Sequence, residues 1–590
     1  MYNLECFRKA MVVSSAAMLL WPGLGAARQP DTIYHGGSIV TVNSEFEVAE
    51  AVAVAGGRIV AVGSTEEVKA LATPQTTLVD LKGGALLPGF YDNHIHLGGP
   101  LQPWKWAGMI DKVPDWLQGV DTVPELKEAI AGQARKTPKG EWIIGEVPRE
   151  DWPNSALPTR WDLDEVSPDH PVVIARGPHT YLVNSRTLEL AGVTRDTRVP
   201  GGQIVLGEDG EPNGKILESA KKVIQAVMPG SSHAHGSVGD SKEATLADWR
   251  TFLGQLVGLG VTSVNVAGVR PDGLELVETL YERWGDELPR MTVQLRVSPG
   301  YDTHDDVEAG ARESIGEIEA IGDPSKFFKH PKLKMGAVKM SIDGGLSAPV
   351  FWSTEEYENR PGFYGVQRIP DETFFTVARR AHELGWQLGI HTMGDAAVIM
   401  VVEQMKRILD ALPREDHRHY LHHVAVRPPD GTLVDMGKYG IGVASQPGFL
   451  LSLGSYADEA LAGEREETQN PSRSLLDHGI RVSYGSDAGP YGPLAVIFAA
   501  VTRTGWNSVV HGPGEAVSIR EAIAMHTLEP AWFTFDEKER GSIEPGKVAD
   551  FVVLDRDPLS IEPERIPELK VQCTIIGGQT VYAADGASCR

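Results

Sequence analysis

Eight apolar segments of β-strand type, each followed by a stretch of helical type, occur along the middle of the chain and restrict its fold more than any other feature. Repeated β/α units build a parallel sheet covered by helices, and eight of them close into a barrel of the TIM type. We therefore predict an α/β protein with a (β/α)8 barrel. The expected barrel strands cover residues 86–96, 261–269, 291–298, 337–343, 387–391, 419–426, 441–445 and 481–487.

The two ends of the chain carry a different pattern. At 590 residues the chain exceeds the roughly 250–300 residues at which a single core stops growing. Short alternating β-runs with glycine turns fill residues 32–87, and similar runs return over 550–582. We predict that residues 28–85 and 540–590 share one composite β-domain, with the barrel over 86–539.

A long connection separates the first two expected barrel strands, far beyond a normal β/α loop. It predicts an inserted subdomain over about residues 100–245. Six of the 13 tryptophans of the chain fall there, so they either line an apolar pocket over the barrel mouth or form the core of the subdomain. These residues are Trp104, Trp106, Trp116, Trp142, Trp152 and Trp161.

The charge of the chain excludes some partners. The 80 acidic and 55 basic residues give a formal net charge of -25, which repels nucleic acid and anionic lipid surfaces. The same charge disfavours strongly anionic ligands, unless the local charge of the pocket is positive.

The first 27 residues have the layout of a signal peptide. Arg8 and Lys9 precede an apolar run over residues 10–21, and small residues follow up to Ala27. The run is shorter than the roughly 20 residues of a membrane-spanning helix, so we expect cleavage near Ala27, no stable membrane span afterwards and a periplasmic or secreted protein. The alternative is an uncleaved anchor.

Export bears on the three cysteines of the chain. Cys6 leaves with the leader, and the remaining Cys573 and Cys589 either pair in an oxidising compartment or stay two unpaired thiols.

The sharpest chemical signal is the segment His94-Ile95-His96 at the end of the first expected barrel strand. Side chains at positions i and i+2 of a strand lie on the same side, so these two imidazoles can share one metal ion. Ligands of a barrel metal site come from the carboxyl ends of several strands. Such ends also carry His391, His423 and Asp487.

Each of these five residues alone has a structural explanation, such as a hydrogen-bonded core histidine or a helix-capping aspartate. Their coincidence at predicted strand ends favours a metal site. His422 and His423 are neighbours on one strand, so only one of them is expected to enter the barrel.

Lys339 lies at the end of the fourth expected barrel strand, where a metal site would need an anion. A lysine among apolar residues can lose its proton and take up carbon dioxide, and the resulting carbamate could bridge two metals. The alternative is an ion pair with Asp343, which strand alternation places on the same side.

In order along the chain, these motifs resemble the metal-dependent amidohydrolase superfamily, and more narrowly its YtcJ-like branch (amidohydrolase family 3), which includes N-substituted formamide deformylases. The resemblance covers about residues 31–582. It rests on Pro-Gly-Phe-x-Asp-x-His-x-His, Val-Lys, Ile-His-x-x-Gly-Asp, Gln446-Pro447, Gly-Ser-Asp and the closing Gly-Ser-Ile-Glu-Pro-Gly-Lys-Val-Ala-Asp.

The resemblance implies a (β/α)8 barrel with a composite β-sandwich built from both chain ends, and it also implies roles for the site residues. His94 and His96 would bind one metal, His391 and His423 a second, and a carbamate on Lys339 would bridge them. Asp487 would be a ligand and the catalytic general base, while His179 and Asp343 would face the substrate. The implied cofactor is one or two Zn²⁺ ions, although a ligand set without thiolates also suits Mn²⁺, Fe²⁺ or Co²⁺.

Three departures from the family pattern make the substrate harder to carry over than the metal site. The usual Glu-His reads His422-His423, a common arginine is replaced by Ala396, and the segment after Asp343-Gly344 lacks the commoner Ser-Arg-Thr. We expect an enzyme that hydrolyses a C–N bond, other than a peptide bond, in a small amide substrate with apolar or aromatic groups. Alternatives are a lactonase, a cyclic-imide or ester hydrolase with the same site, and a non-catalytic exported binding protein. The sequence leaves the oligomeric state, including a homo-oligomer, open.

Overall fold

The computed structural model describes most of the chain. The predicted signal peptide lies outside the described residues, as do Trp104, Trp106 and Trp152. The described residues are 29–98, 102–103, 110–111, 115–117, 120, 122–147, 157–176, 179–229, 241–346, 350–487, 489, 491–505 and 508–589.

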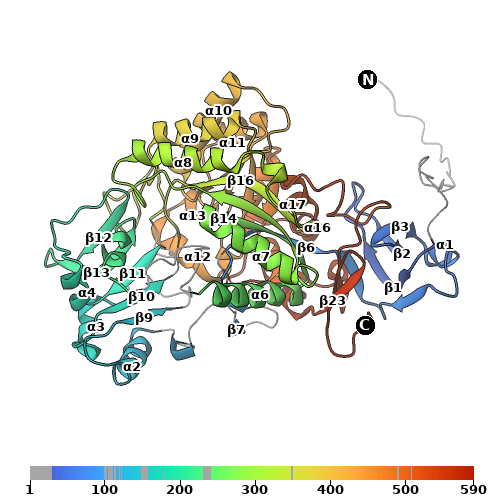
Figure 1. Ribbon diagram of the computed structural model, residues 1–590, viewed down its shortest axis with the longest axis horizontal. Helices are drawn as coiled ribbons and strands as arrows, with labels where there is room; N and C mark the ends of the chain where they lie inside the picture. Colours follow the sequence, from blue (N-terminus) through green and yellow to red (C-terminus); the bar gives the residue numbers. More distant parts are fainter. Residues whose placement is uncertain are drawn as a thin grey trace, which may run out of the picture.

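An eight-stranded parallel barrel forms the centre of the molecule (Figure 1). Its strands follow in sequence order around the sheet, and a parallel bridge between Ile95 and Asp487 joins the last strand region back to the first. The predicted (β/α)8 fold is therefore confirmed. The strands are β6 (Phe90–Ile95), β14 (Val261–Val269), β15 (Arg290–Arg296), β16 (Leu333–Ser341), β17 (Leu388–Thr392), β18 (Tyr420–His423), β19 (Gly442–Ser445) and β20 (Val482–Tyr484).

Helices surround the barrel because each presents one apolar face. In α9 (Asp371–Glu383) the buried residues Phe374, Val377, Ala378 and Ala381 recur at helical spacing. The other covering helices are α6 (Lys242–Gly258), α7 (Leu274–Trp284), α8 (Val307–Ile321), α10 (Asp395–Ala411), α11 (Asp430–Tyr439), α12 (Phe449–Ala460), α13 (Glu464–Glu467), α14 (Ser472–Asp477), α15 (Pro493–Thr502), α16 (Ile519–Ala524) and α17 (Leu528–Phe533).

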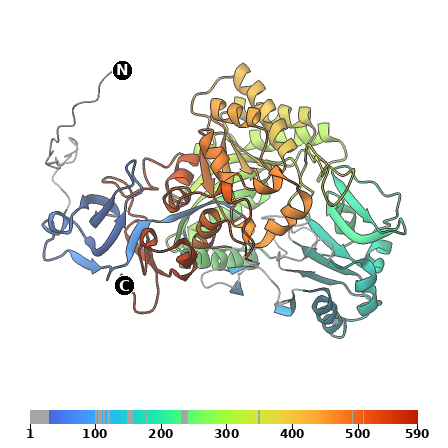
Figure 2. The same cartoon turned by 180° about the vertical axis from the view of Figure 1, so that it is seen from behind.

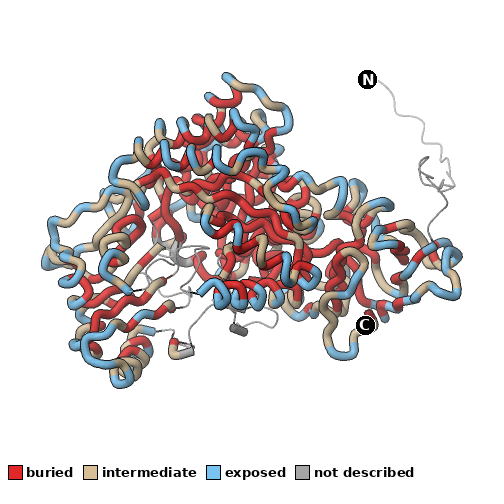
Figure 3. The backbone as a smooth tube through the Cα atoms, in the orientation of Figure 1, coloured by how far each residue is buried: buried red, intermediate tan, exposed pale blue. Residues whose placement is uncertain are grey.

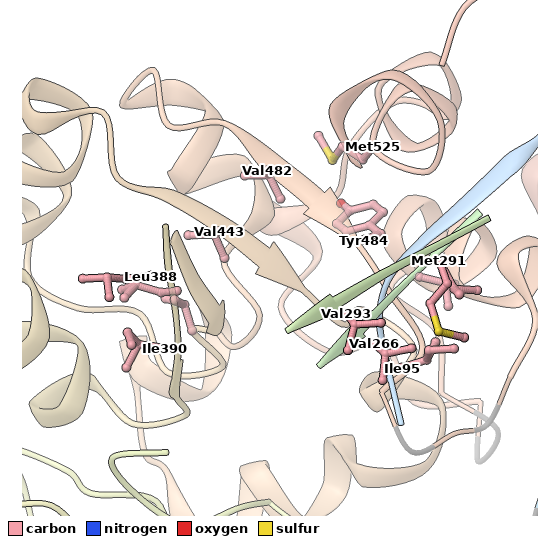
Figure 4. Close-up of a cluster of buried hydrophobic side chains, with 14 of the residues drawn as sticks. Ile95, Val266, Met291, Val293, Leu388, Ile390, Val443, Val482, Tyr484 and Met525 are labelled. Atoms are coloured by element: carbon pink, nitrogen blue, oxygen red, sulfur yellow. The ribbon is translucent and has the colours of Figure 1, made fainter. Parts of the chain in front are cut away.

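The main hydrophobic core lies between the strands and this layer of helices. Figure 3 shows buried strands inside helices whose outer faces are exposed. Figure 4 shows part of the core, where Ile95, Val266 and Val293 of three neighbouring strands lie close together. Every residue of β14 is buried, as expected of a parallel strand covered on both faces.

A second sheet at one end of the molecule contains strands from both ends of the chain (Figures 1 and 2). The strands are β1 (Thr32–Val40), β2 (Val48–Ala55), β3 (Arg58–Gly63), β4 (Thr77–Asp80), β5 (Ala85–Pro88), β21 (Phe551–Leu554), β22 (Val571–Ile576) and β23 (Gln579–Ala583). A short helix, α1 (Thr65–Lys69), precedes β4. β5 joins the two halves because it pairs with β1 on one side and with β21 on the other.

The strand expected over residues 86–96 is in fact two strands in two sheets. Gly89 separates them, and its N–H bonds to Asp550 O at 2.9 Å. A side chain at position 89 would collide with Thr262, so the chain passes closely between the sheets there. The first barrel strand therefore begins at Phe90, four residues later than expected.

The insertion folds at the opposite end from the composite sheet (Figure 1). Its sheet contains β9 (Ile143–Glu146), β10 (Val172–Arg176), β11 (Thr180–Val183), β12 (Gly202–Leu206) and β13 (Pro212–Glu218), and its helices are α2 (Val123–Ala134), α3 (Arg160–Val166), α4 (Ser185–Leu190) and α5 (Lys221–Gln225). A separate pair of short strands, β7 (Gln102–Pro103) and β8 (Ile110–Asp111), precedes it. Trp116 and Trp142 pack against its hydrophobic clusters, and Trp161 is 44% exposed. Trp116 and Trp142 therefore belong to the core of the subdomain, which was one of the two alternatives for the tryptophans.

Cys573 and Cys589 form a disulfide with their Cα atoms 6.4 Å apart. Both cysteines are buried in the core of the composite sheet, together with Tyr34 and Phe551. In the part of the chain that the structure describes, we find no helix with the length and apolarity needed to cross a membrane.

Candidate active site

The carboxyl ends of the barrel strands bring the predicted site residues to one face. His94 and His96 come from β6 and its end, Lys339 from β16, His391 from β17, and His423 from β18. Asp487 lies three residues beyond the end of β20. Because all eight strands are parallel, residues far apart in sequence meet at one mouth.

The Asp487 carboxylate lies between two of the histidines. Its Oδ1 is 3.2 Å from His96 Nε2 and 3.6 Å from His94 Nε2. One ligand atom from each of His94, His423 and Asp487 also lies within 4.8 Å of the other two. These residues therefore form a compact group that could hold one metal ion.

Both histidines at the end of β18 lie near His94, which differs from the expectation that only one would enter the barrel. The ring centroids of His422 and His423 lie 4.2 and 4.8 Å from that of His94. The reason is the backbone: His423 has a φ of 77°, so the alternation of an extended strand ends there. His422 lies in the barrel interior, with Nε2 3.0 Å from Gln294 Oε1.

His391 extends the group toward Asp343. The ring of His391 lies 4.4 Å from that of His423, and its Nε2 is 3.5 Å from Asp343 Oδ1. Asp343 is fully buried and accepts the backbone N–H groups of Met393, Gly394 and Trp352. Burial raises the pKa of Asp343 to about 7. The structure thus gives Asp343 a role in holding the loops after β16 and β17, and its substrate contact stays a prediction.

Lys339 is 2% exposed, and its Nζ has no hydrogen-bond partner among the described residues. The alternative ion pair with Asp343 is not formed there. Burial lowers the pKa of Lys339 well below its ordinary value, and the positive charges of Arg296 and Arg368 act in the same direction against the opposing effect of Asp487. Burial thus favours the neutral amine form of Lys339, which lies beside the histidines.

The insertion contributes His179, which lies over this mouth between β10 and β11. Its ring centroid is 6.1 Å from that of His391, and its Nδ1 is 2.9 Å from Glu218 Oε1. A side chain at Gly345 would overlap the His179 ring, so glycine allows the barrel loop to pass beneath it.

Glu218 is ionised at neutral pH. Burial opposes the charge of its carboxylate, but His179 and Arg368 outweigh burial and lower the pKa of Glu218 to about 2. Arg368 Nη1 is 3.2 Å from Glu218 Oε2. Glu218 is therefore an acceptor that orients His179.

Three residues without a predicted role connect the site. Asp92 Oδ1 accepts the backbone N–H groups of His94 and Ser486, and the Gln446 amide lies between the Nδ1 atoms of His94 and His423. Glu218 is the third. Asp92 and Gln446 belong to quoted motif segments, so their positions were visible in the sequence, whereas no local pattern identifies Glu218.

The donor set fits a divalent metal ion. The Nε2 atoms of His94 and His391 are buried without hydrogen-bond partners in the described part of the chain, as is Lys339 Nζ. Burial lowers the pKa of both histidines well below the ordinary value, so each imidazole is neutral and keeps a lone pair for a metal. Nitrogen and oxygen ligands without thiolate suit Zn²⁺, Mn²⁺, Fe²⁺ or Co²⁺.

An α/β barrel with histidines and a carboxylate gathered at the carboxyl ends of its strands is the architecture of a barrel metalloenzyme. The chain belongs to the amidohydrolase family, whose model matches residues 77–582. A model of an imidazolonepropionase-like composite domain of bacteria matches residues 51–72. The predicted family is confirmed.

Known relatives match nearly the whole chain. The amidohydrolase YtcJ of Bacillus subtilis is 31% identical over 93% of this chain and 99% of its own length. The N-substituted formamide deformylase of Arthrobacter pascens is 30% identical over 94% of this chain and 99% of its own.

Among solved structures, an uncharacterized metal-dependent hydrolase from Pyrococcus horikoshii shares the fold with a TM-score of 0.63. It is 22% identical in sequence, and the match covers 90% of this chain and 99% of that chain.

Proposed function

We propose that the protein is an exported hydrolase that cleaves the C–N bond of a small amide of the N-formyl or N-acyl type with one or two divalent metal ions. Zn²⁺ is the ion that a histidine-rich ligand set favours. The convergence of His94, His96, His423 and Asp487 beside the unpaired Lys339 amine carries this proposal.

The residues divide into two groups of ligands. His94, His96 and Asp487 would hold one ion, and His391 and His423 would hold a second, with a carbamate on Lys339 between them. When bound, such an ion lowers the pKa of water toward about 7 and polarises the carbonyl of the substrate.

Asp487 would serve as the general base and then as the general acid. Its Oδ1 is directed toward the histidines, so it can take a proton from the attacking water and return it to the leaving nitrogen. The φ of Asp487 is 57°, and this left-handed backbone directs the side chain into the group.

Lys339 would become a carbamate by adding carbon dioxide. The amine nitrogen forms a new N–C bond to carbon dioxide, one C=O bond opens to give a carboxylate-like group, and a proton leaves the nitrogen to solvent. The neutral amine thereby becomes an anion, which would attract metal ions where an ammonium would repel them.

His179 would contact the substrate from the insertion. Because Nδ1 donates to the Glu218 carboxylate, Nε2 is left for the substrate. The similarity to an N-substituted formamide deformylase supports the N-formyl class, which we propose as the first to test.

The test is metal analysis and hydrolysis by protein purified from the exported fraction. We expect about two Zn²⁺ per chain, release of formate from N-benzylformamide, loss of activity with a chelator and its return with Zn²⁺. Lys339→Ala should lose metal and activity, whereas Lys326→Ala, whose side chain is 81% exposed, should keep both.

Two results would overturn parts of this proposal. Less than one metal per chain in both the wild type and Lys339→Ala would exclude the two-metal mechanism. Full metal content without hydrolysis of amides, lactones, imides or esters would favour the non-catalytic binding protein.

A further inference from the structure

A line of hydrogen-bonded polar side chains crosses the interior of the barrel and ends at His422. Its members come from different strands, and each is at most 1% exposed. The bonds run from His422 to Gln294 (3.0 Å), then on to Asn265 (3.2 Å), Asn93 (3.0 Å) and Ser483 (2.5 Å). Bulky apolar side chains usually fill the interior of such a barrel, so a buried polar line calls for a function.

The line fixes which ring nitrogen of His422 carries the proton. The Gln294 amide donates through Nε2 to Asn265 Oδ1, so its oxygen, Oε1, faces His422. An amide oxygen only accepts, and His422 Nε2 therefore donates and leaves the lone pair of the neutral ring on Nδ1. Gly389 allows this placement, because a Cβ there would lie 2.8 Å from Gln294 Oε1.

The other nitrogen of His422 lies beside the predicted ligands. His422 Nδ1 is buried without a hydrogen-bond partner among the described residues, and the same is true of His94 Nε2. The centroids of the two rings are 4.2 Å apart. On β17, the residue in register with His422 is His391, another predicted ligand. Because buried polar atoms in native proteins nearly always have a partner, these two nitrogens are expected to bind an ion.

We infer that His422 is a further ligand, through Nδ1, of the metal ion that His94, His96 and Asp487 would hold. The inference rests on the proposed function. A metal-bound histidine almost always donates its other ring N–H to an oxygen that fixes the ring, and this is the arrangement of His422 and Gln294. His422 replaces the usual glutamate of the family pattern, so this ligand is particular to this chain.

The added ligand narrows the choice of metal. Three neutral imidazoles and one carboxylate form a set in which nitrogen predominates. Imidazole suits Zn²⁺, whereas carboxylate and carbonyl oxygens suit Mn²⁺. His422 therefore makes the site selective for Zn²⁺ over Mn²⁺.

The first test measures the Zn²⁺ affinity of metal-free protein by competition with a chromophoric chelator. His422→Gln removes the nitrogen ligand and should lower the affinity at least about 100-fold, more than the loss of a group that only orients a ligand. Gln294→Met removes the acceptor that fixes the ring and should lower it about 10- to 100-fold. The Tm of each metal-free variant shows that it is folded. If His422→Gln does not fold, wild-type affinity in Gln294→Met overturns the inference.

His526→Gln is the matched control. His526 is also fully buried, and its Nε2 also has no hydrogen-bond partner in the described part of the chain. Its Nδ1 lies 3.4 Å from the backbone oxygen of Tyr91, at the amino end of β6 and away from the site. His526→Gln should therefore keep the wild-type Zn²⁺ affinity.

The absorption spectrum of the Co²⁺-loaded protein tests whether His422 contacts the ion, because its visible bands depend on the number and type of ligands. The bands should change in His422→Gln and stay unchanged in His526→Gln. His422→Glu, which offers oxygen in place of nitrogen, should bind Mn²⁺ more tightly relative to Zn²⁺ than the wild type does. Lower affinity with unchanged bands in His422→Gln would show that the ring only supports His94, and would overturn the inference.

These measurements need no substrate, so they separate the ligand from the proposed reaction. If His422→Gln loses affinity and changes the Co²⁺ bands while the wild type hydrolyses no amide, the proposed function fails and the ligand stands. If the wild type hydrolyses N-benzylformamide while His422→Gln keeps its Zn²⁺ affinity and Co²⁺ bands, the proposed function stands and this inference is overturned.

Discussion

Asp92 joins the first and last strand regions of the barrel through Ser486. Its Oδ1 accepts the Ser486 N–H at 3.0 Å, and it also accepts the His94 N–H at 3.2 Å. One buried carboxylate oxygen thus sets the position of a predicted ligand, His94, and of the residue that precedes Asp487.

Asp92→Ala should therefore weaken metal binding about 10- to 100-fold, the usual effect of removing a group that orients ligands. Asp92→Asn keeps an acceptor at Oδ1, so its metal affinity should fall much less. Competition with a chromophoric chelator measures the metal affinity of both variants. Wild-type metal affinity in Asp92→Ala would contradict the orienting role.

Asp487→Asn should lower kcat by about 10² to 10⁴, the usual contribution of a general acid–base. Because the amide can still approach a metal but cannot take a proton, metal content should fall less than kcat. Steady-state kinetics gives kcat and elemental analysis of the same sample gives its metal content. A variant that binds metal and hydrolyses normally would show that another residue is the base.

Gly345→Ala should displace His179, because the added Cβ would lie 2.3 Å from His179 Cδ2. We expect kcat/KM to fall about tenfold, since misplacing a group that positions substrate is costly, while metal content stays unchanged. Gly316→Ala is the control, because no atom lies within 4 Å of its added Cβ. Equal kinetics in the two variants would argue against a role for His179.

Three histidines outside the site should make stability depend on pH. His419 Nε2 lies 2.9 Å from His382 Nδ1, and His417 Nδ1 accepts the His419 N–H at 2.9 Å. Burial lowers the pKa of all three, that of His419 well below 6.5. Their unfolded forms therefore take up protons first, so this stability is complete above about pH 6.5 and is lost as the pH falls below it.

Thermal denaturation at a fixed scan rate between pH 7.5 and 5.5 measures this effect. The loss of Tm on acidification should be smaller in His419→Gln than in the wild type, because both proteins share the metal site and differ only in this cluster. If Tm fell equally with pH in the wild type and in His419→Gln, the prediction would be contradicted.

The disulfide offers a test of export. Cys573 and Cys589 are 16 residues apart, and closing a loop of that length stabilises a protein by about 3 kcal/mol. Protein from the exported fraction should contain no titratable thiol before denaturation and reduction, and Cys589→Ser should lower its Tm. Two reactive thiols in the denatured, unreduced protein would contradict both the bond and an oxidising compartment.

Much of this arrangement could be predicted from local pattern. The barrel strands were identified from apolar runs in the sequence. Burial of one face of a strand gives alternating apolar residues, and burial of both faces gives a continuous apolar run. His94, His96, His391, His423 and Asp487 were found because strand ends of a parallel barrel necessarily meet. The boundary at Gly89 was missed because an uninterrupted apolar run does not reveal which sheet each half joins.

Other features depend on contacts between segments far apart in the chain. The sequence left Lys339 with two interpretations, and only the packed barrel removed Asp343 as its partner, by giving that carboxylate three backbone N–H groups. The sequence alone determined the barrel and the residue types at its mouth, since periodicity and strand-end chemistry are local. The tertiary structure decided that His422 lies beside His94 and that Glu218 orients His179, because these relationships depend on which distant side chains burial brings together.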